Sequence, residues 1–158
     1  MVLGGGDTAM DCVRSAIRQG VASVTVAYRR SREQLRASPK EITAAQEEGV
    51  ELVLHKQPQA FVGEGVLEGV RFADDDAKSV QPCDIAIIAV GQVAERADWL
   101  TKLDIATDER GFISVDENGR TSHPKVFVGG DNSHGPNLVV TAVAAGQRAS
   151  QGIVASLK

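Results

Sequence analysis

The residues near the start of the chain that are best suited to chemistry form one short stretch: Gly4, Gly5, Gly6, Asp7, Thr8 and Ala9. Gly4 would permit a tight turn, Gly6 would let the backbone approach a pyrophosphate, and Ala9 would let a following helix pack closely on a sheet. The N-terminus of that helix would offer free N–H groups and a partial positive charge to phosphates. A glycine triplet is also an ordinary flexible turn, so this interpretation depends on the flanking elements.

Two adjacent arginines, Arg29 and Arg30, follow the glycines at the distance where a site for NAD usually has an Asp or Glu. That acidic residue binds the ribose 2′-OH, whereas guanidinium groups hold a 2′-phosphate through paired, charge-assisted hydrogen bonds. Arg36 is a third candidate, while Arg32 fits a solvated loop. A solvated loop is also the alternative for the whole cluster. The arginines therefore favour NADP(H) over NAD(H).

A second glycine pattern lies near the C-terminus, where Gly130 and Asp131 follow an apolar segment and precede an expected helix. The first turn of this helix consists of Leu138, Val139, Val140 and Thr141. The positive end of its dipole would favour negative charge on a ligand. A Gly-Gly-Asp sequence on its own is a common turn, and the nearby His134 is interpreted as a solvent-facing loop residue.

A βαβ unit is needed to position the glycines and the arginines. Residues 2–3 end a buried strand, apolar periodicity predicts a helix over residues 8–19, and residues 24–28 predict a second strand. Gly20 is placed for a left-handed cap at the end of the helix. This arrangement is the context that a dinucleotide fingerprint requires.

The following segment predicts a helix over residues 39–48, which Ser38 caps and Glu41 completes as a capping box. A strand over residues 50–55 and a hairpin over residues 59–72 come next.

The most apolar run, residues 84–91, predicts a strand covered on both faces, as in a parallel sheet. Gly91 and Gln92 at its carboxyl end occupy the place where ligands bind in doubly wound sheets, and a plain tight turn fits them equally well. Further along we expect a helix over residues 96–103, strands over residues 111–115 and 126–128, and a helix over residues 138–157.

Composition argues against several classes of function. The 158 residues are 42% apolar with a formal net charge of −4, which gives no general attraction to nucleic acid or to anionic membranes. No run of about eighteen apolar residues and no signal peptide is present, so we expect a cytoplasmic protein without a membrane partner. Cys12 and Cys83 belong to no CxxC pair, which argues against disulfide exchange and an iron–sulfur cluster. The carboxylates at residues 74–76 are interpreted as a solvated turn rather than a metal site.

Two stretches carry a resemblance to a known family: GGGDTAMDC at residues 4–12 and SVTVAYRRSREQLRASPKEI at residues 23–42. They resemble the NADPH-binding domain of the glutamate synthase small subunit and related flavoproteins such as dihydropyrimidine dehydrogenase, in the pyridine nucleotide-disulfide oxidoreductase superfamily. The resemblance implies that the loop Ala89-Val90-Gly91-Gln92 lies over the nucleotide. It also implies that Asp131 contacts the ribityl and phosphate region of FAD, and that residues 138–141 face the flavin ring.

The flavin site of the resembled family also uses an amino-terminal GxGxxG unit that grips the FAD adenylate. This chain has one glycine fingerprint, and that one carries the arginines. We therefore expect the chain to bind NADP(H), and we assign FAD to an intact parent enzyme rather than to this chain alone.

Together these features predict an α/β protein with a Rossmann-like FAD/NAD(P)-binding fold, a parallel sheet core and an antiparallel hairpin appendage. Residues 1–93 would form an NADP(H)-binding domain and residues 94–158 a partial FAD-binding segment. The resemblance implies that NADPH passes a hydride to FAD, and that electrons continue to an electron-accepting subunit or domain. We expect a fragment that is inactive alone, a homodimer, and no catalytic acid–base residue.

Two other functions remain open. One is a non-catalytic nucleotide-binding or subunit-docking module that has lost its flavin half. The other is an NAD(P)-linked dehydrogenase of a small substrate, which no Tyr-xxx-Lys or His–carboxylate pairing supports.

Overall fold

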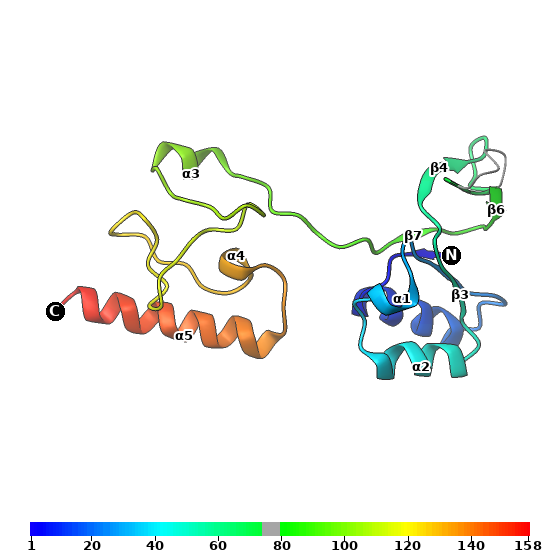
Figure 1. Cartoon of the computed structure of the whole chain (residues 1–158), viewed down its shortest axis with the longest axis horizontal. Coiled ribbons are helices and arrows are strands. Elements are labelled where there is room, and N and C mark those ends of the chain that lie inside the picture. The colour runs from blue at the N-terminus through cyan, green and yellow to red at the C-terminus, as the bar shows by residue number, and fades with distance from the viewer. Residues whose placement is uncertain (74–79) are drawn as a thin grey trace. The chain divides into compact units, whose positions relative to one another are not determined.

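The computed structural model describes residues 1–73 and 80–158, which form two compact units, Met1–Gly91 and Gln92–Lys158 (Figure 1). Each unit is described by itself below. The carboxylates at residues 74–76, interpreted above as a solvated turn, lie outside the described residues. None of the described helices is long and apolar enough to cross a membrane.

The central sheet of the first unit has four parallel strands: β1 (Val2–Leu3), β2 (Thr25–Ala27), β3 (Glu51–Val53) and β7 (Ile87–Ile88). Their order is β3-β2-β1-β7, and Val2 lies opposite both Val26 and Ile87. Helix α1 (Asp7–Arg18) connects β1 to β2, and helix α2 (Pro39–Glu47) connects β2 to β3. These are two successive βαβ units, so the predicted Rossmann-like fold with a parallel core is confirmed.

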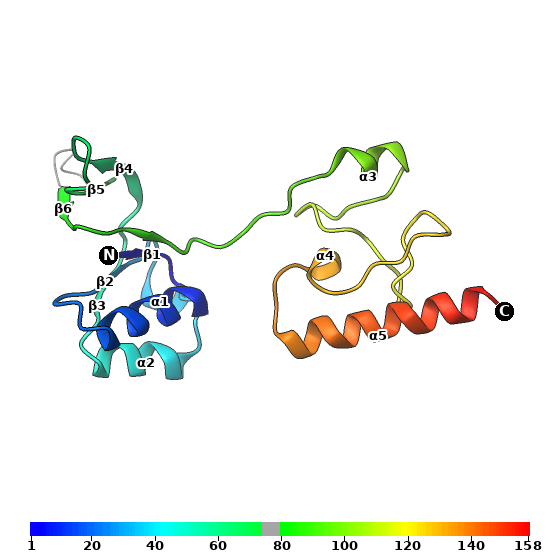
Figure 2. The ribbon, with the colours of Figure 1, turned by 180° about the vertical axis from the view of Figure 1, so that it is seen from behind.

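Side chains on β1 and β2 alternate between two cores, because successive residues of a strand point to opposite faces. Val2 and Val26 pack with buried residues of α1 and α2, whereas Leu3 and Ala27 pack with apolar residues of a second sheet. Helices α1 and α2 lie side by side on one face of the parallel sheet in both views (Figure 1 and Figure 2). The central strands are therefore covered on both faces, which gives the turn after β1 a rigid base.

The second sheet is antiparallel, in the order β4-β5-β6, and consists of β4 (Pro58–Val62), β5 (Gly69–Phe72) and β6 (Val80–Pro82). Strands β4 and β5 form the hairpin that the sequence predicts, with Phe61 opposite Val70. Strand β6 was not predicted, because three residues are too few to show an alternating pattern. The antiparallel appendage is confirmed and is three-stranded.

Helix α1 buries Ala9, Met10 and Val13 against the sheet, as its apolar periodicity predicts. The chain reverses at Gly20, whose φ of +86° lies in the left-handed region that glycine adopts without strain. The glycine therefore separates α1 from β2 as expected.

Helix α2 begins at the predicted place but is capped differently. Ser38 Oγ accepts a hydrogen bond from the Glu41 backbone N–H at 3.3 Å, and Pro39 is the first helical residue. The reciprocal half of the predicted capping box is wrong, because the Ser38 backbone N–H donates to Asp7 Oδ1 at 3.0 Å. Since α1 supplies the carboxylate for that N–H, the Glu41 side chain pairs with Arg14 instead.

The strand predicted over residues 84–91 is shorter and less covered than expected. Only Ile87–Ile88 form strand β7, and the side chains of Ile88 and Val90 are 62% and 68% exposed. A strand is buried on its faces only where other elements pack on them, and the described core clusters of the first unit do not include the side chains of β7. The expected burial on both faces is therefore wrong for this unit.

The second unit contains three helices among its described residues: α3 (Asp98–Lys102), α4 (Asp131–His134) and α5 (Val139–Ser156). Helix α5 confirms the helix predicted over residues 138–157. The strands expected over residues 111–115 and 126–128 are wrong, because the backbone there forms only isolated antiparallel bridges at Ile113 and Phe127. A strand needs a neighbour over several residues, and this described segment supplies a single pair at each place.

Candidate functional site

The turn between β1 and α1 brings the backbone of Gly4 very close to the end of β7. Gly4 has a φ of +148°, and a Cβ atom at this position would collide with the backbone carbonyl of Ala89. The Gly4 N–H donates to the Ala27 carbonyl at 3.1 Å, which ties the turn to the end of β2 as well. The tight turn predicted for Gly4 therefore has a steric reason, and three strand ends meet at it.

Gly6 lies at the open side of the same turn. It is the N-cap of α1 with an extended φ of −104°, and no side chain makes a capping hydrogen bond there. No described atom lies within 4 Å of the place where a Cβ would stand. The backbone at Gly6 and the first turn of α1 can therefore be reached by a ligand with phosphate groups.

Gly5 has a different role from its two neighbours, because the chain packs against it. A Cβ at Gly5 would lie 2.5 Å from Tyr28 Cδ2 and 2.7 Å from Leu35 Cδ2. Its carbonyl accepts hydrogen bonds from the backbone N–H groups of Arg36 at 2.8 Å and Ala37 at 3.0 Å. Gly5 thus holds the segment of residues 31–38, which we call the arginine loop, against the glycine turn.

A cavity of about 430 Å³ opens beside the glycine turn at the carboxyl ends of the parallel strands. Eight of the predicted binding residues line it: Gly4, Gly5, Gly6, Thr8, Arg29, Arg30, Arg36 and Gly91. Asp7, Ala9 and Gln92 are absent from the described lining. Ala9 is fully buried under the sheet, which is the packing position predicted for it. The glycines and the arginines therefore line the same cavity, although more than one element separates them along the chain.

The charge of this cavity is positive. Among the described residues that line it, Arg29, Arg30 and Arg36 carry guanidinium groups and none carries a carboxylate. All three arginines are exposed, so their side chains are free to reorient around a ligand. Such a lining suits an anionic ligand with more than one phosphate.

The lining also includes Ala89 and Val90 of the loop that the resemblance places over the nucleotide. Sequence reasoning missed five residues of the lining: Leu3, Ala27, Tyr28, Gln57 and Pro58. Gln57 and Pro58 come from the connection between β3 and β4. The rule that ligands bind beyond the carboxyl ends of parallel strands could have indicated Gln57, since the third strand was predicted to end shortly before it.

The arginine loop contains a short 3₁₀ helix, η1 (Arg32–Gln34), and is held on both sides of Arg36. The Tyr28 hydroxyl donates to the Gln34 carbonyl at 2.6 Å on one side of Arg36, and the Ser38 N–H donates to Asp7 on the other. Arg32 turns away from the cavity and donates to Gln46 Oε1 at 2.7 Å. Arg32 therefore does not join Arg29, Arg30 and Arg36 in the described lining of the cavity.

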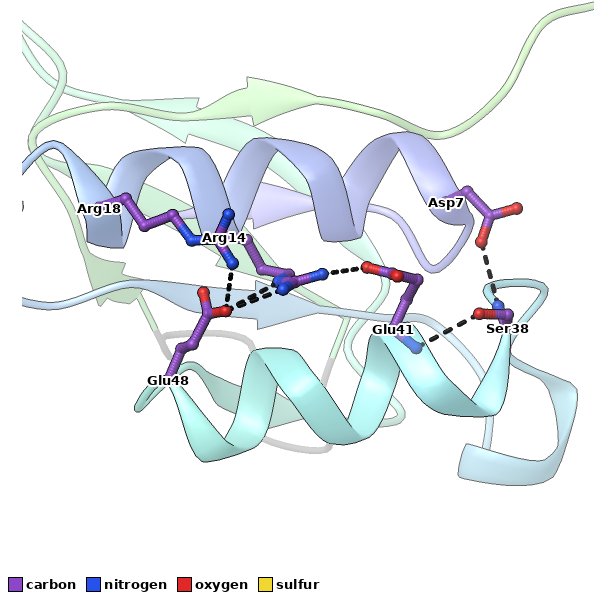
Figure 3. A network of polar contacts seen from close by, with 6 residues as sticks. All are labelled: Asp7, Arg14, Arg18, Ser38, Glu41 and Glu48. Atoms are coloured by element: carbon purple, nitrogen blue, oxygen red, sulfur yellow. Dashed lines mark hydrogen bonds and ion pairs between the residues drawn. The ribbon is translucent and has the colours of Figure 1, made fainter.

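Charged side chains join α1 to α2 along their length (Figure 3). Arg14 pairs with Glu41 and with Glu48, and Arg18 pairs with Glu48 at 2.5 Å. The hydrogen bonds from Arg14 and Arg18 lower the pKa of Glu48 from 4.5 to about 2. The hydrogen bond to Glu48 in turn raises the pKa of Arg14. This network fixes the two helices that begin at the glycine turn and at the arginine loop.

The second unit has a separate cavity of about 330 Å³. Two predicted residues, Gln92 and Asp131, line it together with the aromatic side chains of Trp99 and Phe112. Asp131 is the first residue of α4 and is exposed. Gly130 is absent from the described lining. The four residues of the predicted helix start are absent from it as well: Leu138, Val139, Val140 and Thr141.

His134 was predicted to be a solvent-facing loop residue, and this is wrong. It lies in α4, where its ring is half-buried and Nδ1 donates to the Gly135 carbonyl at 2.9 Å. A four-residue helix is too short to be recognised from apolar periodicity. The position of His134 gives no reason to assign it a catalytic role.

A parallel sheet with a glycine turn between its first strand and first helix defines a Rossmann-like dinucleotide-binding class of protein. A model of the Pyridine nucleotide-disulphide oxidoreductase family matches residues 1–146, so the chain belongs to that family. Members of the family use FAD and NAD(P)H. Cys12 and Cys83 are both free and pack against different core clusters, so they form no disulfide pair in this chain.

The chain is similar to glutamate synthase small chains over nearly its whole length. It is 42% identical to "Glutamate synthase [NADPH] small chain" of Halomonas elongata, with 98% of this chain and 37% of the relative covered. It is 40% identical to the protein of the same name from Escherichia coli K12, with 98% of this chain and 38% of that relative covered. The chain thus spans less than two fifths of the length of these relatives.

Solved structures have the same fold. Thioredoxin reductase of Lactococcus lactis superposes with a TM-score of 0.82 at 28% identity, over 98% of this chain and 51% of that one. Thioredoxin reductase of T. acidophilum superposes with a TM-score of 0.85 at 24% identity, over 99% of this chain and 52% of that one. The α/β fold with a parallel and an antiparallel sheet is therefore shared with these thioredoxin reductases.

Proposed function

We propose that the chain is the NADP(H)-binding part of a flavin-dependent oxidoreductase that resembles the glutamate synthase small chain. The observation that carries this proposal is the cavity of the first unit, where an open glycine turn and three arginines face one space. When bound, NADPH and FAD supply the hydride chemistry, and the protein positions them. No acid–base side chain is needed for such a transfer, and we assign none.

The residues of the first unit fit the phosphate groups of NADP(H). Gly6, Thr8 and the N-terminal N–H groups of α1 would hold the pyrophosphate, because the turn is open there and the helix dipole favours negative charge. Arg29, Arg30 and Arg36 would hold the 2′-phosphate. A carboxylate would accept hydrogen bonds from a ribose 2′-OH, and the described lining of the cavity has none. This combination supports NADP(H) rather than NAD(H).

The second unit would contribute to a flavin site in a longer enzyme. Gln92 and Asp131 share its cavity, and residues 138–141 form the exposed start of the long helix α5. The chain contains one glycine fingerprint, and the first unit uses it. We therefore expect that the chain by itself binds NADP(H) without retaining FAD, and that an electron-accepting subunit or domain completes the enzyme.

The exposed apolar side chains of α5 favour a second role for the same unit as a subunit-docking surface. Val139 and Val140 are 78% and 72% exposed at the start of the helix. Apolar side chains gathered in this way mark protein interfaces more often than free surface. We propose that a second copy of the chain covers them in solution, which is a homodimer.

Isothermal titration calorimetry with NADPH and NADH tests the proposed function. We expect NADPH to bind at least tenfold more tightly, a difference of about 1.4 kcal/mol. Replacing both Arg29 and Arg30 with Ala should remove the preference and leave the affinity for NADH nearly unchanged. Arg32→Ala is the matched control, because Arg32 is held by Gln46 outside the cavity. Equal affinities of the unmodified chain for the two nucleotides would contradict the proposal.

A further inference from the structure

Asp7 follows the glycine turn directly, yet its side chain does not join the cavity that the neighbouring residues line. Its carboxylate accepts a hydrogen bond from the Ser38 backbone N–H, with 3.0 Å between Oδ1 and N (Figure 3). Ser38 is the N-cap of α2 and also the last residue of the arginine loop. One carboxylate thus connects the N-termini of two helices.

This connection solves an electrostatic problem at the turn. A carboxylate in the first turn of α1 lies near the place where a pyrophosphate would bind, and two negative groups repel each other there. The Ser38 N–H and the positive end of the α2 dipole attract the carboxylate away from that place. The glycine turn therefore keeps its positive character although an acidic residue follows it.

The same hydrogen bond restrains Arg36, which lies two residues before Ser38. The backbone N–H of Arg36 is bound to the Gly5 carbonyl at 2.8 Å, and the adjoining residue Ala37 is buried. The Tyr28–Gln34 hydrogen bond restrains the other side of Arg36. The backbone on both sides of Arg36 is therefore held against the glycine turn, while its side chain lines the cavity.

We propose that Asp7 is a positioning residue for recognition of the 2′-phosphate, acting through the arginine loop and not by touching the nucleotide. This inference rests on the proposed function, because it needs a ligand with a 2′-phosphate. Two residues that are adjacent in the fingerprint then have different roles. Gly6 lets the pyrophosphate approach the backbone, and Asp7 positions Arg36, which binds the 2′-phosphate. Selectivity between the two nucleotides then depends on α1 as well as on the arginines themselves.

The test compares Asp7→Ala, Asp7→Asn and Ser38→Ala by calorimetry with NADPH and NADH on the full 158-residue chain. Asp7→Ala should lower the ratio of the two affinities at least threefold, through weaker NADPH binding, with NADH binding changed less than twofold. Asp7→Asn keeps an acceptor oxygen for the Ser38 N–H and should preserve the ratio within twofold. Ser38→Ala removes the side-chain cap of α2 but keeps its N–H, so it should lower the thermal midpoint and leave the ratio unchanged.

Each result has a distinct meaning. An unchanged ratio of the NADPH and NADH affinities in Asp7→Ala would overturn the positioning role. An equal loss of affinity for both nucleotides would also overturn it, because it would assign Asp7 to the pyrophosphate. If Asp7→Ala does not fold, Asp7→Ser replaces it, because a serine suits a first helical turn and is too short to reach Ser38. A wild-type chain without any preference for NADPH would overturn the proposed function together with this inference. If the wild-type chain prefers NADPH and Asp7→Ala, or Asp7→Ser in its place, keeps the same ratio of the two affinities, the inference alone is overturned.

Discussion

At the scale of single residues, the three consecutive glycines have three different reasons to be glycine. Gly4 has a positive φ and no space for a Cβ beside the carbonyl of Ala89. Gly5 has no space because Tyr28 and Leu35 pack on it, whereas Gly6 has open space. Gly4 and Gly5 are therefore required by the packing of the fold, whereas Gly6 leaves space that a ligand could occupy.

This difference predicts opposite effects of the same substitution. Gly6→Ala should change the free energy of unfolding by no more than about 1 kcal/mol, because φ at Gly6 is −104° and its Cβ position is open. The same substitution should weaken the binding of both NADPH and NADH at least tenfold, about 1.4 kcal/mol. Gly4→Ala should destabilise the chain by about 2–3 kcal/mol through backbone strain and collision. Urea unfolding and nucleotide titration measure the two effects. Unimpaired nucleotide binding by Gly6→Ala would contradict the assignment of the pyrophosphate to this turn.

At the scale of elements, helices α1 and α2 are joined by polar contacts at their N-terminal ends and along their length. The Asp7–Ser38 hydrogen bond lies at the beginning of both helices, and Arg14 and Arg18 reach Glu48 just beyond the end of α2 (Figure 3). Exposed ion pairs contribute little stability one by one, but a shared carboxylate restricts several side chains together. The pairing therefore acts mainly on the relative position of the two helices.

The lowered pKa of Glu48 predicts how stability depends on pH. A carboxyl whose pKa is lower in the folded state stabilises the fold above its unfolded pKa and loses that contribution as the pH falls. For Glu48 the loss should begin near pH 4.5 and continue to about pH 2. Thermal unfolding between pH 7 and pH 3 should show a smaller decline for Glu48→Gln than for the unmodified chain. Glu47→Gln, on the neighbouring exposed position, is the control, and an identical decline in all three proteins would contradict the prediction.

At the scale of the whole molecule, each unit has its own cavity and its own exposed apolar residues. In the first unit they gather on and after β7, and in the second on the start of α5. Both surfaces belong to a chain that spans less than two fifths of its glutamate synthase relatives. These surfaces are what the proposed homodimer and the proposed electron-accepting partner would cover.

The exposed start of α5 predicts self-association. We expect light scattering at tens of micromolar to give the mass of a dimer, because burying Val139 and Val140 removes apolar surface from water. Val139→Asp combined with Val140→Asp should shift the protein towards a monomer. Val66→Asp changes an equally exposed valine of the β4–β5 connection and should leave the mass unchanged. A monomeric unmodified chain would contradict the proposal of a homodimer.

The single glycine fingerprint predicts the behaviour of the chain towards flavin. We expect the purified protein to be colourless and to show no transfer of electrons from NADPH to a dye, even with added FAD. The NADP(H) cavity should remain functional, because residues 3–91 of the first unit supply its whole described lining. Absorbance spectra and dye reduction measure these properties. Bound flavin together with sustained oxidation of NADPH would show that the chain is an enzyme by itself.

The sequence by itself predicted the βαβ core, the start of α2 and the start of α5, and it singled out Gly4, Gly6, Arg29 and Arg30, which line the cavity of the first unit. These features depend on periodicity, caps and turns, which act between residues close together in the chain. Ser38 capped α2 as predicted because its partner, the Glu41 N–H, is three residues away.

Only the tertiary structure decided which distant segments meet. It turned Asp7 from the glycine turn towards Ser38, brought Gln57 and Pro58 into the cavity, and left β7 at the edge of the sheet. The physical reason is the same in each case. A side chain forms a hydrogen bond with the partner that packing brings within reach, and a strand is buried only if other elements cover it. Neither condition can be read from the local sequence pattern.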